Sequence, residues 1–254
     1  MKGISLKQTV ARTPTGIPGL DEMLGGGIPQ GRILLVLGEP GAGKTITCSQ
    51  FLATGINKFG ENGLFVSMEE DKNHYDREMG QFGWDFAAAE KRGQFAFVDA
   101  SPIRSIPGEI KVGNLTIGKQ DFSLISLIEV IRNNAKTIGA TRIVVDPLSL
   151  LIFQYPNEAE RRKVLLDLVE ALSETGATCL LSSELHRVGM RGRSLQVEEY
   201  LVHGVVLMQT APSGKTVERV IQVEKMRETE IDRQPRPYAI TAKGIEVYSK
   251  EVVI

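Results

Sequence analysis

The chain has 254 residues, of which 42% are hydrophobic and 24% charged, which is enough to bury one sizeable core. Its formal net charge of −1 excludes a protein whose overall field attracts nucleic acid or an anionic membrane, so such roles would need a local patch. No apolar stretch approaches the ~20 residues that span a bilayer, and residues 1–16 lack a signal-peptide pattern. We expect a soluble, cytoplasmic protein with a single domain over 1–254 and a flexible segment over about 1–12.

Apolar strand-like runs alternate with helical patterns through the first 180 residues. Strands are expected over 33–38, 63–68, 94–100, 142–147 and 177–183. Helices are expected near 43–59, 71–82, 121–138 and 158–175. Strands flanked by helices predict an α/β fold whose mostly parallel, twisted sheet is covered by helices on both faces.

Two later regions break this rhythm. The Pro- and Gly-rich segment 101–120 is expected to be an excursion between a strand and a helix. After residue 200 short strands follow one another, separated by turn signals such as "PSGK", and predict a C-terminal antiparallel extension. Cys48 and Cys179 both lie in apolar segments, which indicates buried, unpaired thiols and fits a reducing compartment.

The first helix is preceded by "GEPGAGKT", which fits the phosphate-binding pattern G-x-x-x-x-G-K-[ST] from Gly38 to Thr45. Its context, after a buried strand and before a helix, is the one the pattern requires. Glycines let backbone N–H groups converge on phosphate oxygens, and Lys44 would bridge the β- and γ-phosphates of ATP or ADP. The alternative is an ordinary Gly-rich turn. The residues predicted to contact the nucleotide are Glu39, Pro40, Gly41, Ala42, Gly43, Lys44, Thr45 and Ile46.

Acidic residues at two other strand ends complete a phosphate-transfer site. Asp146 ends the strand "RIVVDP" and is predicted to hold Mg²⁺ together with the Thr45 hydroxyl, although an Asp before Pro147 could simply cap the next segment. Glu69 and Glu70 follow the strand "LFVSM", and one or both could orient the attacking water. A solvated acidic turn is the alternative. The residues predict a Mg²⁺-dependent ATPase.

The ordered set of motifs "TPTGIPGLDEMLGGGIPQGR", "GEPGAGKT", "SMEE", "FVDAS", "VEEYLVHGVVLM" and "EKMRET…PYAITAKGIEVY" resembles the KaiC-type branch of the RecA/DnaB superfamily of ATPases. The resemblance covers about Thr13 to Tyr248. It implies a RecA-like domain that forms a homo-oligomeric ring, commonly a hexamer, with ATP bound between subunits. Single-domain chains of this kind resemble the archaeal paralogues of the recombinase RadA.

The resemblance also implies roles for particular residues. It makes Glu69 and Glu70 the catalytic carboxylate pair, and Lys225 and Arg227 cationic fingers that reach the γ-phosphate of the neighbouring subunit. The positions that it predicts to line the nucleotide are Met226, Thr229 and Ile231. The family's small residue after the finger Arg is Glu228 here, which predicts slow hydrolysis or a different turn. The clock protein's Ser-Thr acceptor pair has no counterpart in "VEEYLVHGVVLM", which argues against protein kinase activity.

The segment "HRVGMRGRSLQ" carries Arg187, Arg191 and Arg193 among glycines. In a ring such arginines would line a central channel and could bind single-stranded DNA in a salt-dependent way, while a solvated basic loop is the alternative. An alternative function is therefore a nucleotide-gated recombination accessory or regulatory switch with little turnover.

Overall fold

A nine-stranded sheet forms the centre of the computed structural model, which describes residues 10–100, 110–112, 115–117, 121–155, 157–185, 187–188, 192–193, 195–213 and 216–252. The strand order is β15-β14-β13-β12-β3-β9-β8-β4-β5. The six strands from β12 to β5 are parallel to one another: β12 (Gly204–Ser213), β3 (Ile33–Gly38), β9 (Thr178–Glu184), β8 (Arg142–Asp146), β4 (Gly63–Ser67) and β5 (Phe95–Asp99). The mostly parallel α/β sheet predicted from the sequence is confirmed.

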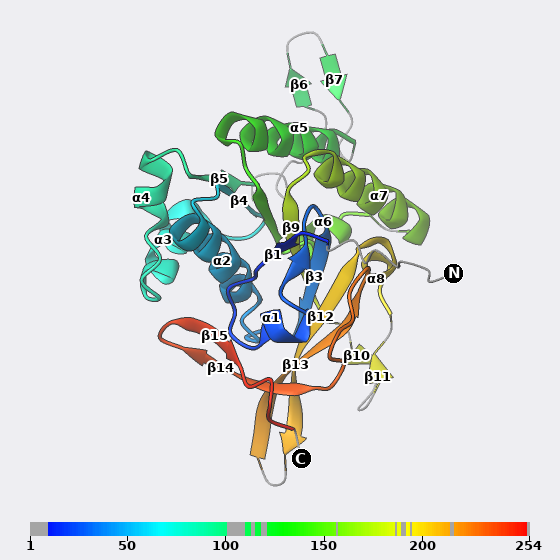
Figure 1. The fold of residues 1–254 in the computed structure, drawn as a ribbon. Coiled ribbons are helices and arrows are strands. Elements are labelled where there is room, and N and C mark those ends of the chain that lie inside the picture. Colours follow the sequence, from blue (N-terminus) through cyan, green and yellow to red (C-terminus); the bar gives the residue numbers. More distant parts are fainter. Residues whose placement is uncertain are drawn as a thin grey trace, which may run out of the picture.

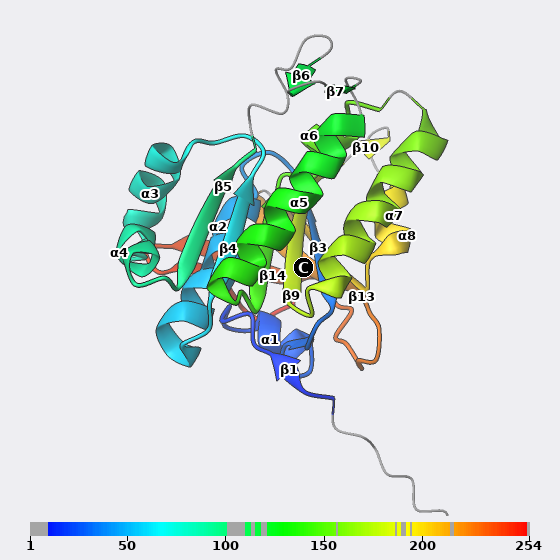
Figure 2. The ribbon, with the colours of Figure 1, turned by 90° about the horizontal axis from the view of Figure 1, so that it is seen from above.

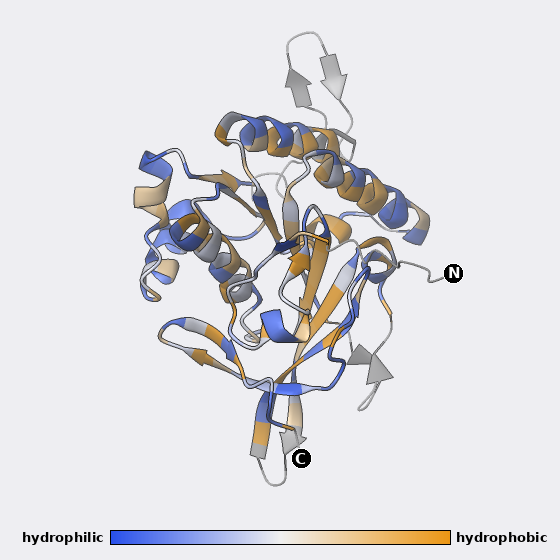
Figure 3. Cartoon of the chain, in the orientation of Figure 1, coloured by the Kyte–Doolittle hydropathy of each residue, from blue (hydrophilic) through white to orange (hydrophobic). Residues whose placement is uncertain are grey.

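Helices cover both faces of this sheet (Figures 1 and 2). One face carries α5 (Asp121–Ile138) and α7 (Glu158–Glu174). The other carries α2 (Lys44–Thr54), a π-helical turn (Gly55–Phe59), α3 (Lys72–Gly80) and α4 (Phe86–Lys91). The strands are apolar on both sides for this reason, and Figure 3 shows hydrophobic and hydrophilic residues alternating along α5 and α7, as expected of helices with one buried and one exposed face.

Successive residues of one strand belong to two different cores. Leu35 packs into the core under α5 and α7, whereas Val36 packs into the core under α2 and α3. Both side chains are at most 1% exposed. Cys48 and Cys179 are buried and unpaired, as predicted.

The C-terminal strands extend the sheet, with one difference from the sequence-based expectation. β13 (Thr216–Met226), β14 (Arg236–Thr241) and β15 (Gly244–Val247) pair antiparallel, as predicted. β12, however, is parallel to β3, so the antiparallel part begins one strand later than the change of rhythm at residue 200 suggests. The β14–β15 hairpin then returns to pack beside α2 (Figure 1).

The remaining elements are short. They are β1 (Arg12–Thr13), α1 (Leu20–Met23), β2 (Ile28–Pro29), β6 (Ile110–Val112), β7 (Leu115–Ile117), α6 (Ser149–Ile152), β10 (Arg187–Val188), β11 (Gly192–Arg193) and α8 (Val197–Leu201). Of the expected excursion over 101–120, the described residues are the antiparallel pair β6–β7. None of the helices in the described part of the chain has the length and apolar character needed to cross a membrane.

Candidate functional site

The loop 38–45 connects the carboxyl end of β3 to the start of α2 at the edge where the other parallel strands also end. Gly41 and Gly43 have φ angles of 75° and 90°, which glycine adopts without steric cost. A Cβ at Gly41 would meet nothing within 4 Å, so the loop backbone is open on that side. No described side chain caps the start of α2, which leaves its first N–H groups available to an anion.

Contacts from distant strands fix the shape of this loop. The Glu39 carboxylate accepts hydrogen bonds from the Thr210 amide at 3.1 Å and hydroxyl at 2.7 Å, which ties the loop to β12. The Tyr238 hydroxyl donates to the Ala42 carbonyl at 2.7 Å. Burial raises the pKa of Tyr238 to about 12, so the hydroxyl stays protonated and able to donate at neutral pH.

The contribution of the C-terminal hairpin to the loop does not follow from the sequence patterns. These patterns place "PYAIT" only in the sheet extension, yet Tyr238 binds the loop. A Cβ at Gly43 would lie 3.1 Å from both Ile240 Cδ1 and Ile245 Cδ1, so the hairpin also packs on the loop glycine. Only the β14–β15 pairing brings these side chains to the loop, and no local pattern announces that pairing.

Lys44, the first residue of α2, turns back over the loop. Its Nζ donates to the carbonyl oxygens of Gly38 at 3.0 Å and Glu39 at 3.1 Å. The ammonium group is thus held at the mouth of the glycine loop, where the motif predicts that it meets phosphate oxygens.

Asp146 meets Thr45 directly, although the two are 101 residues apart. The Thr45 hydroxyl donates to Asp146 Oδ2 at 2.7 Å, and the Ser182 hydroxyl donates to Oδ1. Asp146 is 6% exposed. Burial raises the pKa of Asp146, although the Ser182 and Thr45 hydroxyls lower it by donating to the carboxylate. The predicted pair of metal-binding oxygens therefore lies together in the structure.

The two glutamates following β4 lie in different environments. β4 ends at Ser67, and the Ser67 hydroxyl accepts from the amides of Glu69 at 3.3 Å and Glu70 at 2.8 Å, so both residues belong to a turn. Glu69 is exposed and Glu70 is half-buried.

Both carboxylates lie near Asp146, the predicted metal ligand. Burial raises the pKa of Glu70, and the charges of Glu78 and Asp146 raise it further. The charge of Glu69 in turn adds to the raised pKa of Asp146. The Glu70 Oε2 atom is buried and has no hydrogen-bond partner among the described residues, so this oxygen is available to accept a proton.

The glycine loop lies at the carboxyl ends of the parallel strands, whereas the amino ends lie beside Lys225, Met226 and Arg227. Gly204 at the start of β12 pairs with Leu34 on one side and Met226 on the other, whereas Gly38 pairs with Met208. Gly204 and Met208 are four residues apart along β12, which separates the two ends by about 13 Å. Lys225, Met226 and Arg227 therefore do not share a site with the loop of their own chain.

The residues that follow β13 pack against the N-terminal region. The Thr229 hydroxyl accepts from Arg12 at 3.1 Å, and Ile231 is partly buried against the core of α1 and α2. Glu228 has a φ of 60°, the conformation that a glycine adopts freely, and its carboxylate pairs with Arg32 at 2.8 Å. Glu228 therefore occupies a backbone conformation that favours glycine, and its side chain is held by Arg32.

Most side chains of the candidate DNA-binding loop lie outside the described residues. Arg187 and Arg193 pair through their backbones in β10–β11, but their side chains and all of Arg191 lie outside the described residues.

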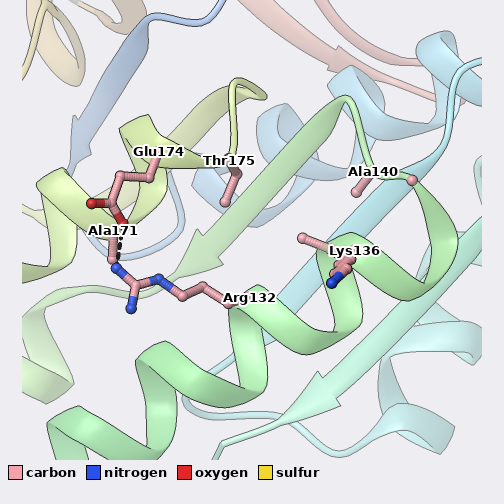
Figure 4. A pocket seen from close by; sticks show the side chains of 8 residues that line it. Arg132, Lys136, Ala140, Ala171, Glu174 and Thr175 are labelled. Carbon is pink, nitrogen blue, oxygen red and sulfur yellow. Dashed lines mark hydrogen bonds and ion pairs between the residues drawn. The ribbon is translucent and has the colours of Figure 1, made fainter.

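A hollow between α5 and α7 is separate from the candidate site (Figure 4). Its lining includes Arg132 and Glu174, which form an ion pair, together with Lys136, Ala140 and Thr175. Ala140 and Thr175 precede β8 and β9, so the hollow lies at the amino ends of the strands, away from the glycine loop.

Known proteins resemble this chain over nearly its whole length. The family model "ATPase: KaiC" matches residues 13–252. A UPF0273 protein of Pyrococcus horikoshii is 38% identical over 242 residues, covering 95% of this chain and 96% of that protein. The circadian clock protein KaiC3 of Synechocystis sp. is 34% identical over 241 residues, covering 94% of this chain and 46% of KaiC3.

The fold has a solved counterpart as well. The crystal structure of a KaiC-like protein from Pyrococcus horikoshii matches with a TM-score of 0.79 and 33% identity, covering 94% of this chain and 99% of that one. The resemblance and the RecA-like fold predicted from the motifs are confirmed.

The buried Asp146 carboxylate predicts that Asp146→Asn stabilises the nucleotide-free protein. Because the folded-state pKa of Asp146 lies above the ordinary value of 3.8, the ionised carboxylate lowers the free energy of unfolding. The contribution of protonated Asp146 to the free energy of unfolding is fully present below pH 3.8 and is lost as pH rises through the raised pKa. The gain in free energy of unfolding of Asp146→Asn over the wild type should therefore be near zero at acidic pH. It should grow with pH and level off above the raised pKa of Asp146.

Thermal unfolding across about pH 4–8 measures this difference, with about 2–4 °C expected for each kcal/mol in a chain of this size. Glu170→Gln on the exposed face of α7 is the control and should show no such pH-dependent gain. An Asp146→Asn protein that is less stable than wild type at every pH would contradict the assignment.

Proposed function

The chain belongs to the KaiC family of P-loop ATPases, and we propose that it binds ATP with Mg²⁺, hydrolyses it, and works as a ring of its own copies. The observation that carries the proposal is the hydrogen bond between Thr45 and Asp146 beside the uncapped start of α2. It joins two oxygen ligands of the kind that Mg²⁺ prefers to a cluster of N–H donors suited to phosphate.

The residues of the site fit both proposed ligands. The open backbone at Gly41 leaves room for a phosphate, and the Lys44 ammonium now bonded to loop carbonyls can instead donate to phosphate oxygens. Asp146 is buried beside two hydroxyls and is electrostatically destabilised in this state. A bound divalent cation would offset that cost and neutralise charge on the transferred phosphate.

Groups of this chain bind the phosphates and activate the water. The loop amides and Lys44 bind and orient the phosphates. Glu70, which has a raised pKa and an Oε2 atom without a partner in the described part of the chain, orients the attacking water and accepts its proton. Glu69 lies at the exposed side of the same turn. Ser182 holds Asp146 from the neighbouring strand.

The finger residues argue for assembly. Because Lys225 and Arg227 lie at the far edge of the sheet, they can meet a nucleotide only if a second copy presents its glycine loop to that edge. A closed ring of identical subunits satisfies this head-to-tail contact for every copy, and a hexamer is the number expected for the family. Met226, Thr229 and Ile231 would then line the neighbour's nucleotide.

A low-turnover switch is the second candidate, and one contact favours it. The Lys225 ammonium donates to two carbonyl oxygens of its own chain, so the finger is not free in this conformation. Regulation of a partner, including a DNA-bound one, would need little hydrolysis.

Mixing two inactive variants tests the shared site. Lys44→Ala removes the phosphate ligand but keeps the finger, and Arg227→Ala does the reverse. Each alone should lose most turnover, because a cationic finger supplied in trans is worth roughly 10³–10⁵ in related reactions. In equimolar mixed rings about a quarter of the interfaces combine an intact loop with an intact finger, so phosphate release should recover to about that fraction.

Arg92→Ala, an exposed arginine at the end of α4, serves as the control and should keep wild-type turnover. If mixed rings form, as mass measurements would verify, and still release no phosphate, the shared site is refuted.

Separate substitutions of the two glutamates assign the water-orienting role. Glu70→Gln should abolish steady-state hydrolysis while ATP still binds, because the amide cannot accept the proton. Glu69→Gln should retain a larger share of turnover, since Glu69 is exposed. Both are read as phosphate release beside a nucleotide-binding assay. Wild-type rates in both variants would remove the pair from the mechanism.

A further inference from the structure

The Lys225 side chain is bound to the end of α8 in its own chain. Its Nζ donates to the carbonyl oxygens of Glu199 and, at 2.9 Å, of Val202. Glu199 lies in the last turn of α8 and Val202 is its C-cap residue, a place where a lysine is stabilised by carbonyl acceptors and by the helix dipole. The cation proposed to act on a neighbouring subunit therefore has a competing position in its own subunit.

The helix α8 is in turn held against the end of β9. The Ser183 hydroxyl donates to Glu198 Oε1 at 3.1 Å, and Glu198 is 6% exposed. The Gln196 side-chain amide also donates to the Glu184 carbonyl at 3.0 Å. A buried carboxylate depends on such partners, so the position of α8 follows the position of the last residues of β9.

The residue before Ser183 belongs to the nucleotide site. Ser182 donates to Asp146, and neighbouring residues of a strand point to opposite faces of the sheet. Leu180 and Leu181 show this alternation, because they pack into the two different cores. Ser182 therefore faces Asp146 and α2, whereas Ser183 faces α8, and one peptide bond joins the two contacts through the sheet.

We propose that this series of contacts controls the finger. Whether a protomer's own Asp146 keeps its hydrogen bond from Ser182 determines whether Lys225 stays on α8 or is released toward the neighbouring subunit. Glu198 is the positioning residue, because it connects Ser183 to the helix that holds Lys225. The two positions of Lys225 are the two states of the switch. The inference rests on the proposed function only in assigning Lys225 to the neighbour's phosphate.

The same contacts indicate whether the intact connection inhibits or activates the finger. Lys225 loses its two carbonyl acceptors if α8 moves away, and the Arg227 amide stays bonded to the His203 carbonyl at 3.0 Å. Breaking the connection at any point should therefore release Lys225 alone and leave the strand that carries it in place. The intact connection is inhibitory.

The first test needs no nucleotide. An amine-reactive reagent is applied to the free protein, and the labelling rate of Lys225 is measured by mass spectrometry against that of the exposed Lys243. Ser182→Ala, Ser183→Ala and Glu198→Gln should each raise the relative rate about 2–30-fold, the range expected when a coupling of this kind is broken. Ser182→Ala is the most informative, since Ser182 does not touch α8 or Lys225.

Ser173→Ala removes an exposed hydroxyl from α7 and is the matched control, for which no change is expected. An unchanged Lys225 rate in Ser182→Ala, with the protein folded, would overturn the proposal whether or not the protein hydrolyses ATP. Conversely, a raised rate would support it even if the hydrolytic function failed.

The second test separates positioning from structural damage. Glu198→Gln should raise kcat about 2–30-fold, whereas damage to the fold would lower it. In a Lys225→Ala background the same substitution should change kcat less than about twofold, because its effect passes through Lys225. A fall in kcat, or an increase that persists without Lys225, would contradict the proposal.

Discussion

The hydrogen bond between the Thr45 hydroxyl and Asp146 Oδ2 is the interaction on which the site depends. It connects the start of α2 to the end of β8, and β9 lies between β3 and β8 in the sheet. The Ser182 hydroxyl, supplied by β9, takes the other carboxylate oxygen. Three parallel strands must therefore end at the same level for one carboxylate to be satisfied, and their hydrogen-bonded register provides this.

Two groups in the candidate site are unfavourable for the free energy of folding. Asp146 is buried with a raised pKa, and Glu70 has a buried oxygen without a partner among the described residues. Neither feature stabilises the fold by itself, and both suit a site that would gain stability on binding a cation and a phosphate. The rest of the sheet, with two apolar cores, supplies the stability that tolerates them.

The parts of the fold and site that were predictable from sequence are those fixed by local chemistry. Short runs of consecutive residues identify the glycine loop with its lysine and the strand that ends in Asp146. The structure brings Thr45 and Asp146 together as expected. The parallel pairing of β12 and the return of the β14–β15 hairpin to the loop depend on contacts between distant segments, which no short pattern encodes. The attachment of Lys225 to α8 is of the same kind, since its acceptors are backbone carbonyls that the sequence does not distinguish. The proposed roles in catalysis and assembly remain predictions.

The central claim is that the loop, Lys44 and the Thr45–Asp146 pair together hold ATP with a divalent cation. Titration calorimetry of the folded protein with ATP, with and without Mg²⁺, tests it most directly. We predict binding that weakens at least about tenfold, or 1.4 kcal/mol, when Mg²⁺ is removed, and that disappears in Lys44→Ala. No binding by the folded wild-type protein, or equal affinity in Lys44→Ala, would contradict the account.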